Sequence, residues 1–105
     1  MPPQPDFLND PRQITNEAWI GDAVLSLYAR LKILREDGVL DGDKCIRLTS
    51  NKFLGSIGEP TRVEAVIGRC FEREGLSGAF AWIEANLIPL FERQEQNRSR
   101  KPARR

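Results

Sequence analysis

Two acidic residues of this 105-residue chain stand within apolar stretches: Asp22 in AWIGDAVL and Glu64 in TRVEAVIG. A carboxylate buried without a partner is strongly destabilising, so each acid requires a cation or a hydrogen-bond donor. If the two segments are helices that pack together, Asp22 and Glu64 can share one metal ion. Alternatively, Asp22 pairs with an arginine such as Arg62 or Arg69, or each acid lies at the edge of its apolar stripe.

The residue before Asp22 is also unusual for a helix. Gly21 inside a helix costs about 1 kcal/mol relative to alanine, which suggests that another group approaches the backbone closely there. The runs EAWIG (17–21) and EAVIG (64–68) share the pattern E-A-x-I-G. Departures from local rules tend to gather at functional sites, and here they gather around Asp22.

Composition limits the chemistry further. The chain has no histidine, which excludes Ser-His and Cys-His nucleophiles and histidine acid–base pairs. Residues 98–105 (RSRKPARR) carry five positive charges and no acid; removing them from the net charge of +1 leaves −4 on residues 1–97. An acidic body with a basic arm suits a metal-using nucleic-acid enzyme, although a basic terminus is equally often only a solvated tail.

The sequence contains no membrane signal. No apolar run approaches the roughly 20 residues that span a bilayer, and the start MPPQPDFLNDP lacks the apolar segment of a signal peptide. We therefore expect no membrane partner and a cytoplasmic location. Cys45 and Cys70 have no CxxC spacing and lie in apolar-periodic segments, which favours free core thiols over a zinc site or a disulfide.

Apolar spacing predicts an all-α domain of four or five helices and no strand. We expect an extended lead-in over residues 1–13, a helical domain over 14–93, and a basic disordered tail over 94–105. The first helix begins near Thr15 or Asn16 and ends at Gly38, and a second covers about 43–57. A third runs from Pro60 to Gly75, and a fourth is kinked at Pro89. The expected buried stripe of the first helix is Ile20, Val24, Leu27, Leu31 and Leu34, and further apolar residues place this helix at the centre or at a dimer interface.

Three segments resemble the ribonuclease III family. NEAWIGDAVLSLYAR is similar to its signature helix, TRVEAVIG to its second acidic helix, and RLTSNKFLGSI (47–57) to the helix between them. The likeness is closest to Mini-ribonuclease III, which consists of the catalytic domain without a double-stranded-RNA-binding domain. The resemblance implies that Asp22 and Glu64 are catalytic Mg²⁺ ligands. It also implies an endoribonuclease that cleaves double-stranded RNA as a homodimer and uses no small-molecule cofactor.

The chain departs from the family in two ways. Ala18 and Thr61 stand where full-length enzymes have two further acids, an absence that Mini-ribonuclease III shares. Glu17 does not replace them, because it lies about 140° around the helix from Asp22. The family's long middle region is reduced here to GSIGEPT, so RNA binding must come from other groups. The candidates are Lys44, Arg47, Lys52, Arg62, Arg98, Arg100 and Lys101.

Two alternatives remain open at this point. The first is a catalytically inactive dimer of the same type that binds structured RNA or a ribosomal particle, which the shortened middle favours. The second is a protein-interaction module in which Trp82, Leu87 and Phe91 form a partner surface. In that second case Asp22 and Glu64 should lie far apart in the fold.

Overall fold

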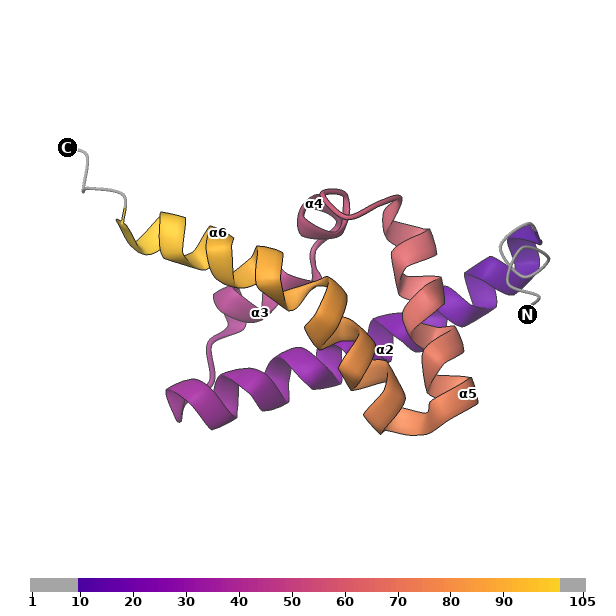
Figure 1. Ribbon diagram of the computed structural model, residues 1–105, viewed down its shortest axis with the longest axis horizontal. Helices are drawn as coiled ribbons and strands as arrows, with labels where there is room; N and C mark the ends of the chain where they lie inside the picture. The colour runs from indigo at the N-terminus through magenta and orange to yellow at the C-terminus, as the bar shows by residue number, and fades with distance from the viewer. Residues whose placement is uncertain (1–9, 101–105) are drawn as a thin grey trace.

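The computed structural model describes residues 10–100. The elements in this range are all helices, and no strand occurs among these residues, so the all-α expectation is confirmed (Figure 1). The helices are α2 (Pro11–Asp37), α3 (Gly42–Thr49), α4 (Asn51–Leu54), α5 (Pro60–Asn86) and α6 (Ile88–Arg100). None of them is both long enough and apolar enough to pass through a bilayer.

Helix α2 begins earlier than the sequence suggested. The Asp10 carboxylate accepts a hydrogen bond from the backbone N–H of Arg12 at 3.0 Å, and Pro11 occupies the first helical position. Both are strong start signals, because the cap satisfies a free N–H and proline has none to satisfy. The expected start near residues 14–16 was wrong because Pro11 was counted with the prolines of the lead-in. Residues 1–9 of that lead-in lie outside the described range.

The expected second helix is divided in two. Ser50 leaves the helical conformation, with ψ at 155°, and its hydroxyl accepts a hydrogen bond from the backbone N–H of Phe53 at 3.1 Å. It therefore ends α3 and caps α4. Residues 55–58 form the turn to α5, which starts at Pro60 under the cap of Glu59.

Helix α5 bends where a break was expected. Gly75 has φ 75° and ψ −172°, a conformation that favours glycine, and the chain turns there before helical geometry resumes. A second break follows at Leu87, so Pro89 lies in the first turn of α6 instead of kinking a continuous helix. Helix α6 then continues to Arg100. Residues 94–100 are therefore helical, contrary to the expected disordered tail, and residues 101–105 lie outside the described range.

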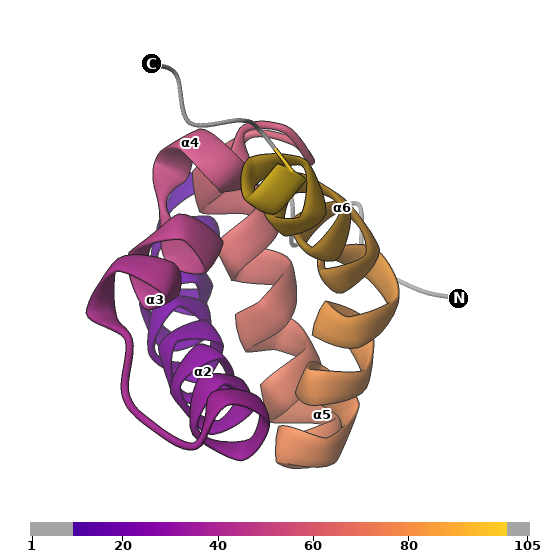
Figure 2. The ribbon, with the colours of Figure 1, turned by 90° about the vertical axis from the view of Figure 1, so that its left-hand side faces the viewer.

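The core lies between α2, the two halves of α5 and the start of α6, with α3 and α4 closing one side (Figure 2). Its fully buried large side chains are Leu25, Leu48, Leu54, Ile67, Ile83, Leu87 and Phe91. Leu87 and Phe91 therefore do not form a partner surface, and Trp82 packs against the same core. Cys45 and Cys70 are free and also pack against it.

The buried face of α2 differs from the expected stripe. Tyr28, Ala29 and Ile33 point inward, whereas Leu27 and Leu34 are 40% and 50% exposed. Because α2 is apolar on two sides, the spacing of leucines alone did not identify the side that packs against α5. The unexpected consequence is an apolar stripe on the outer side of this helix.

Candidate carboxylate site at the crossing of α2 and α5

Helices α2 and α5 cross with their backbones in contact at two glycines. A Cβ atom on Gly21 would overlap the carbonyl group of Glu64, and one on Gly68 would overlap the carbonyl group of Glu17. Both glycines are buried. Only glycine permits this approach, as expected for Gly21, because any side chain would push the helices apart.

The two E-A-x-I-G segments are therefore the two sides of one contact. The glycine that ends each segment lies on the carbonyl of the glutamate that begins the other. Residue 17 of α2 lies opposite residue 68 of α5, and residue 21 lies opposite residue 64. Because the numbers rise along one helix as they fall along the other, the two helices are antiparallel at the crossing. The sequence similarity between the segments thus has a structural counterpart.

The crossing brings Asp22 next to Glu64. The pKa of the Glu64 carboxyl is raised to about 7, first by burial and then by the charge of Asp22 and a side-chain hydrogen bond with Asp22. The charge of Glu59 contributes least. Two carboxyl groups this close favour a shared proton over two negative charges. Near neutral pH the Glu64 carboxyl is therefore between its protonated and its ionised form.

The two acids differ in exposure. Asp22 is exposed and Glu64 is half-buried, so the interpretation of Asp22 as a buried charge was wrong. Asp22 lies at the edge of the α2 face that packs on α5, where water reaches it. The pair is distinguished by the closeness of two acidic groups and by the exposure of Asp22, which leaves it accessible to a ligand from solvent.

The buried acid of α2 is Glu17, which sequence reasoning did not select. It is 3% exposed; its Oε2 accepts a hydrogen bond from Gln13 at 3.1 Å and lies 3.7 Å from the guanidinium of Arg69. Its other oxygen, Oε1, has no hydrogen-bond partner among residues 10–100. The available signal was the repeat itself, in which Glu17 occupies the position of Glu64.

The environment of Glu17 favours its protonated form. Its pKa is raised to about 7, first by burial and then by the neighbouring carboxyl group of Glu72, while Arg69 and Gln13 act in the opposite direction. A protonated Glu17 can donate to Glu72 and so satisfy the buried oxygen. Each end of the crossing thus holds an acid pair that retains a proton near neutral pH.

The Asp22–Glu64 pair suits a magnesium ion. Proteins usually bind Mg²⁺ through one or two carboxylates together with waters and substrate phosphates. Asp22 and Glu64 supply two neighbouring carboxylates, whose mutual repulsion a cation would relieve. Within residues 10–100 no three Asp, Glu, His or Cys side chains are grouped closely enough to hold a metal ion. The ligands beyond Asp22 and Glu64 would therefore be water and phosphate oxygens.

The candidate RNA-binding cations lie in different places. Lys44 forms an ion pair with Asp37 at 3.1 Å, and Arg62 is exposed at the start of α5. Three others come together, because Arg47, Lys52 and Arg98 line adjoining pockets between α3, α4 and α6. The side chain of Arg100 and the whole of Lys101 lie outside the described part of the chain.

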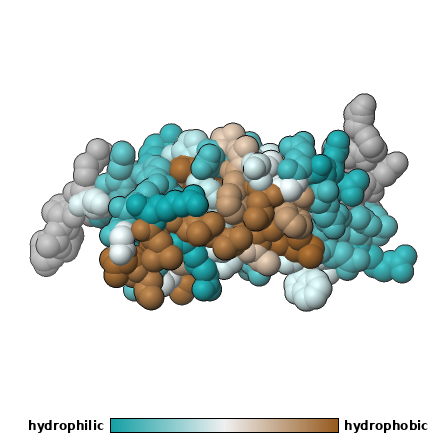
Figure 3. Space-filling view, turned by 90° about the horizontal axis from the view of Figure 1, so that it is seen from below, coloured by the Kyte–Doolittle hydropathy of each residue, from teal (hydrophilic) through white to brown (hydrophobic). Residues whose placement is uncertain are grey.

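An apolar band covers the outer side of α2 and its connection to α3. Its exposed members are Leu27, Leu34, Val39, Leu40 and Ile46. Seen from below the view of Figure 1, hydrophobic residues form a continuous band across the molecule (Figure 3). Part of it is hollowed by a cavity of about 510 Å³ between α2 and α3, lined by Leu34, Leu40 and Ile46 among others.

Comparison with known proteins adds no relative. No protein-family model, no curated protein and no solved structure matches the chain.

Proposed function

We propose that this protein is a Mg²⁺-dependent endoribonuclease of the ribonuclease III type that cleaves double-stranded RNA as a homodimer. The observation that carries the proposal is the meeting of Asp22 and Glu64 from two helices held together by Gly21 and Gly68. These are the two acids that the sequence resemblance selects. A protein-interaction module without an acid site was expected to have these two residues far apart in the fold, and they are close together.

Asp22 and Glu64 act as ligands in this proposal, not as nucleophiles. Asp22 and Glu64 would hold the Mg²⁺ ion, which would supply a water of lowered pKa and positive charge next to the phosphate oxygens. Glu64 must first give up the proton that it shares with Asp22, because only ionised carboxylates are good ligands. Activity should therefore increase as the pH rises through about 7, the pKa of Glu64.

The outer side of α2 supports the homodimer. At about 100° per residue, Trp19, Leu27 and Leu34 lie within about 80° of one another on one side of the helix, and Asp22 lies about 60° beyond Trp19. Trp19 is 79% exposed, and an apolar band of this extent is the kind of surface that an interface covers. We assign a second copy as its occupant, since a dimer formed there places two acid pairs beside one interface, one for each RNA strand.

RNA in the A form is recognised mainly through its shape, phosphates and 2′-hydroxyls, so we expect little sequence preference. A second candidate function is a dimer of the same type that binds structured RNA without cutting it. The observation that favours this alternative is the small acid set: residues 10–100 hold no group of three metal-ligating side chains.

The decisive experiment is a cleavage assay on duplex RNA with and without Mg²⁺. We expect Asp22→Asn and Glu64→Gln each to lower the rate by about 100-fold or more, since loss of a ligand removes several kcal/mol of transition-state stabilisation. Glu17→Gln is the matched control: it changes the equivalent acid of the other E-A-x-I-G segment and should leave cleavage intact. Binding without cleavage would establish the alternative, and cleavage that survives both ligand substitutions would refute the assigned site.

A further inference from the structure

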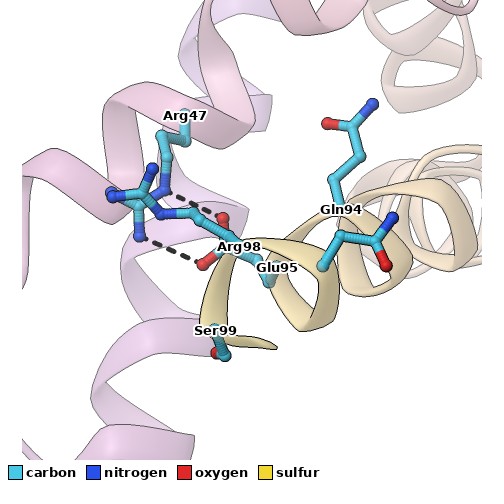
Figure 4. A pocket seen from close by; sticks show the side chains of 6 residues that line it. Arg47, Gln94, Glu95, Arg98 and Ser99 are labelled. Carbon is cyan, nitrogen blue, oxygen red and sulfur yellow. Dashed lines mark hydrogen bonds and ion pairs between the residues drawn. The ribbon is translucent and has the colours of Figure 1, made fainter. Parts of the chain in front are cut away.

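A polar groove runs between α6 and the pair α3 and α4. Two adjoining pockets of about 610 and 230 Å³ share Arg47, Gln94, Glu95 and Arg98, so they form one depression, here called the α6 groove. Lys52 lines its α4 side. The groove is built largely from hydrogen-bonding side chains on two separate parts of the chain. Figure 4 shows Arg47 reaching across to Glu95 on α6, with Arg98 beside this pair and with Gln94 and Ser99 on the same helix.

Arg47 is held in a fixed orientation within the groove. Its Nε and Nη2 donate to the two carboxylate oxygens of Glu95 at 2.8 and 3.0 Å (Figure 4). This hydrogen-bonded pair lowers the pKa of Glu95, which is therefore ionised at neutral pH. A two-point pair fixes the plane of the guanidinium and leaves its remaining N–H groups available to another acceptor.

The charge of the groove is positive. Arg47 and Glu95 cancel, whereas Lys52 and Arg98 are exposed and form no ion pair within residues 10–100. The neutral side chains Gln94 and Asn97 also line the groove and carry hydrogen-bond donors. In the sequence, Arg98 also begins the basic run RSRKPARR. A concave surface that combines an oriented guanidinium, two exposed cations and amide donors matches the chemistry of phosphate oxygens.

We propose that the α6 groove binds the phosphate backbone of RNA. The identity of the polyanion rests on the proposed function, whereas the location of the groove follows from the packing of α6 on α3 and α4. Apart from Ser56, the residues that line this surface lie outside GSIGEPT, the segment where the resembled family carries its basic loop. The α6 groove would give the shortened domain a substrate-binding surface away from Asp22 and Glu64.

The test is binding of a fluorescent duplex RNA, measured by anisotropy in EDTA so that no cleavage occurs. The double variant Lys52→Gln/Arg98→Gln removes two exposed groove cations, and Arg73→Gln/Arg93→Gln removes two exposed cations outside the groove. Each phosphate contact contributes roughly one to the slope of log affinity against log salt, so the groove variant should lower that slope by about two. We expect its affinity to fall about tenfold at moderate salt, and that of the control less than about twofold.

The outcomes separate this inference from the proposed function. If the groove variant binds RNA as wild type does, or if the control loses as much affinity, the groove assignment is refuted even if the wild-type protein cleaves RNA through Asp22 and Glu64. If binding depends on the groove but no cleavage occurs in Mg²⁺, the groove stands and the nuclease proposal fails. If vesicles containing phosphatidylglycerol bind as tightly as RNA with the same groove dependence, the ligand is a membrane surface and the inference is overturned.

Discussion

The backbone of Gly21 lies directly against the carbonyl group of Glu64, and this contact sets the position of the acid pair. Asp22 follows Gly21 in the chain, so the distance between its carboxylate and that of Glu64 depends on how closely the two helices approach. The reciprocal contact of Gly68 with Glu17 fixes the same approach from the other side. Packing and the candidate chemistry therefore depend on the same few atoms.

Replacing either crossing glycine should separate the helices. We expect Gly21→Ala and Gly68→Ala each to lower the free energy of unfolding by about 2 kcal/mol or more, because the added methyl group overlaps backbone, which cannot move aside as a side chain can. Gly42→Ala is the control, since a Cβ there meets no atom within 4 Å. Chemical denaturation measures all three, and equal stability of Gly21→Ala and Gly42→Ala would contradict the close crossing.

Stability should fall as the pH rises through neutrality. Glu17 and Glu64 have pKa values raised from 4.5 to about 7, so the folded state binds their protons more tightly than the unfolded chain does. The resulting stabilisation is complete below about pH 4.5 and is lost as the pH rises through about 7. Denaturation in EDTA at a series of pH values should show the unfolding free energy decreasing between about pH 4.5 and 7 and levelling off above about 7.

The same series on Glu17→Gln identifies one source of this dependence. Glutamine keeps the shape of the protonated acid and cannot ionise, so the decrease with pH should become shallower than in wild type. Gln13 and Arg69 lose a charged acceptor in this variant. This loss affects the free energy of unfolding at every pH above the pKa of Glu17, but it does not reverse the direction in which that free energy changes with pH. An unchanged slope would show that Glu17 does not hold the proton.

A buried lysine connects α6 to α2. The side chain of Lys32 is 7% exposed, and its ammonium group contacts Glu92 at 2.6 Å and Glu36 at 2.7 Å. Glu92→Gln should lower the free energy of unfolding by about 1 kcal/mol, since it weakens a contact between distant parts of the chain and both acids are about half exposed. Glu36→Gln, within the same helix as Lys32, should cost less than about 0.5 kcal/mol. Thermal unfolding measures the difference, and the reverse order would contradict this account.

The apolar band predicts the surface of self-association. Leu27→Glu and Leu34→Glu place a charge on the outer side of α2 and should shift a dimer toward monomer in sedimentation equilibrium. Leu76→Glu is a matched control on α5, because Leu76 is 41% exposed and Leu27 is 40% exposed. Dissociation by the control alone would place the interface elsewhere, and a wild-type monomer at every concentration tested would refute the dimer.

Much of the helical order could be predicted from the sequence because its signals are local. Pro60, Gly75 and the apolar spacing of Ile83, Leu87 and Phe91 each determine structure within one or two turns. The start of α2 was also locally encoded, in Asp10 and Pro11, but other prolines nearby concealed it. The extension of helix α6 beyond its apolar residues was not predicted. It is accompanied by the contact of Glu95 with Arg47, which joins distant parts of the chain and leaves no local pattern in the sequence.

The candidate site was predictable in part for the same reason. Isolated acids and a mid-helix glycine identified Asp22 and Glu64 as unusual, and the structure brings their side chains together. The sequence did not reveal which acid is buried. Glu17 and Asp22 lie on different sides of one helix that is apolar on both, so only the packing of α5 determines that Glu17 is enclosed and Asp22 is open to solvent.

The short turn over residues 55–58 between α4 and α5 has a consequence for changes in chain length. Most of it is exposed, and it joins two helices whose ends are already fixed by the caps at Ser50 and Glu59. Each doubling of a flexible loop costs only about 0.6 kcal/mol. Residues inserted at this turn can therefore enlarge the molecule on one side without changing the contacts of Gly21 and Gly68 at the crossing of α2 and α5.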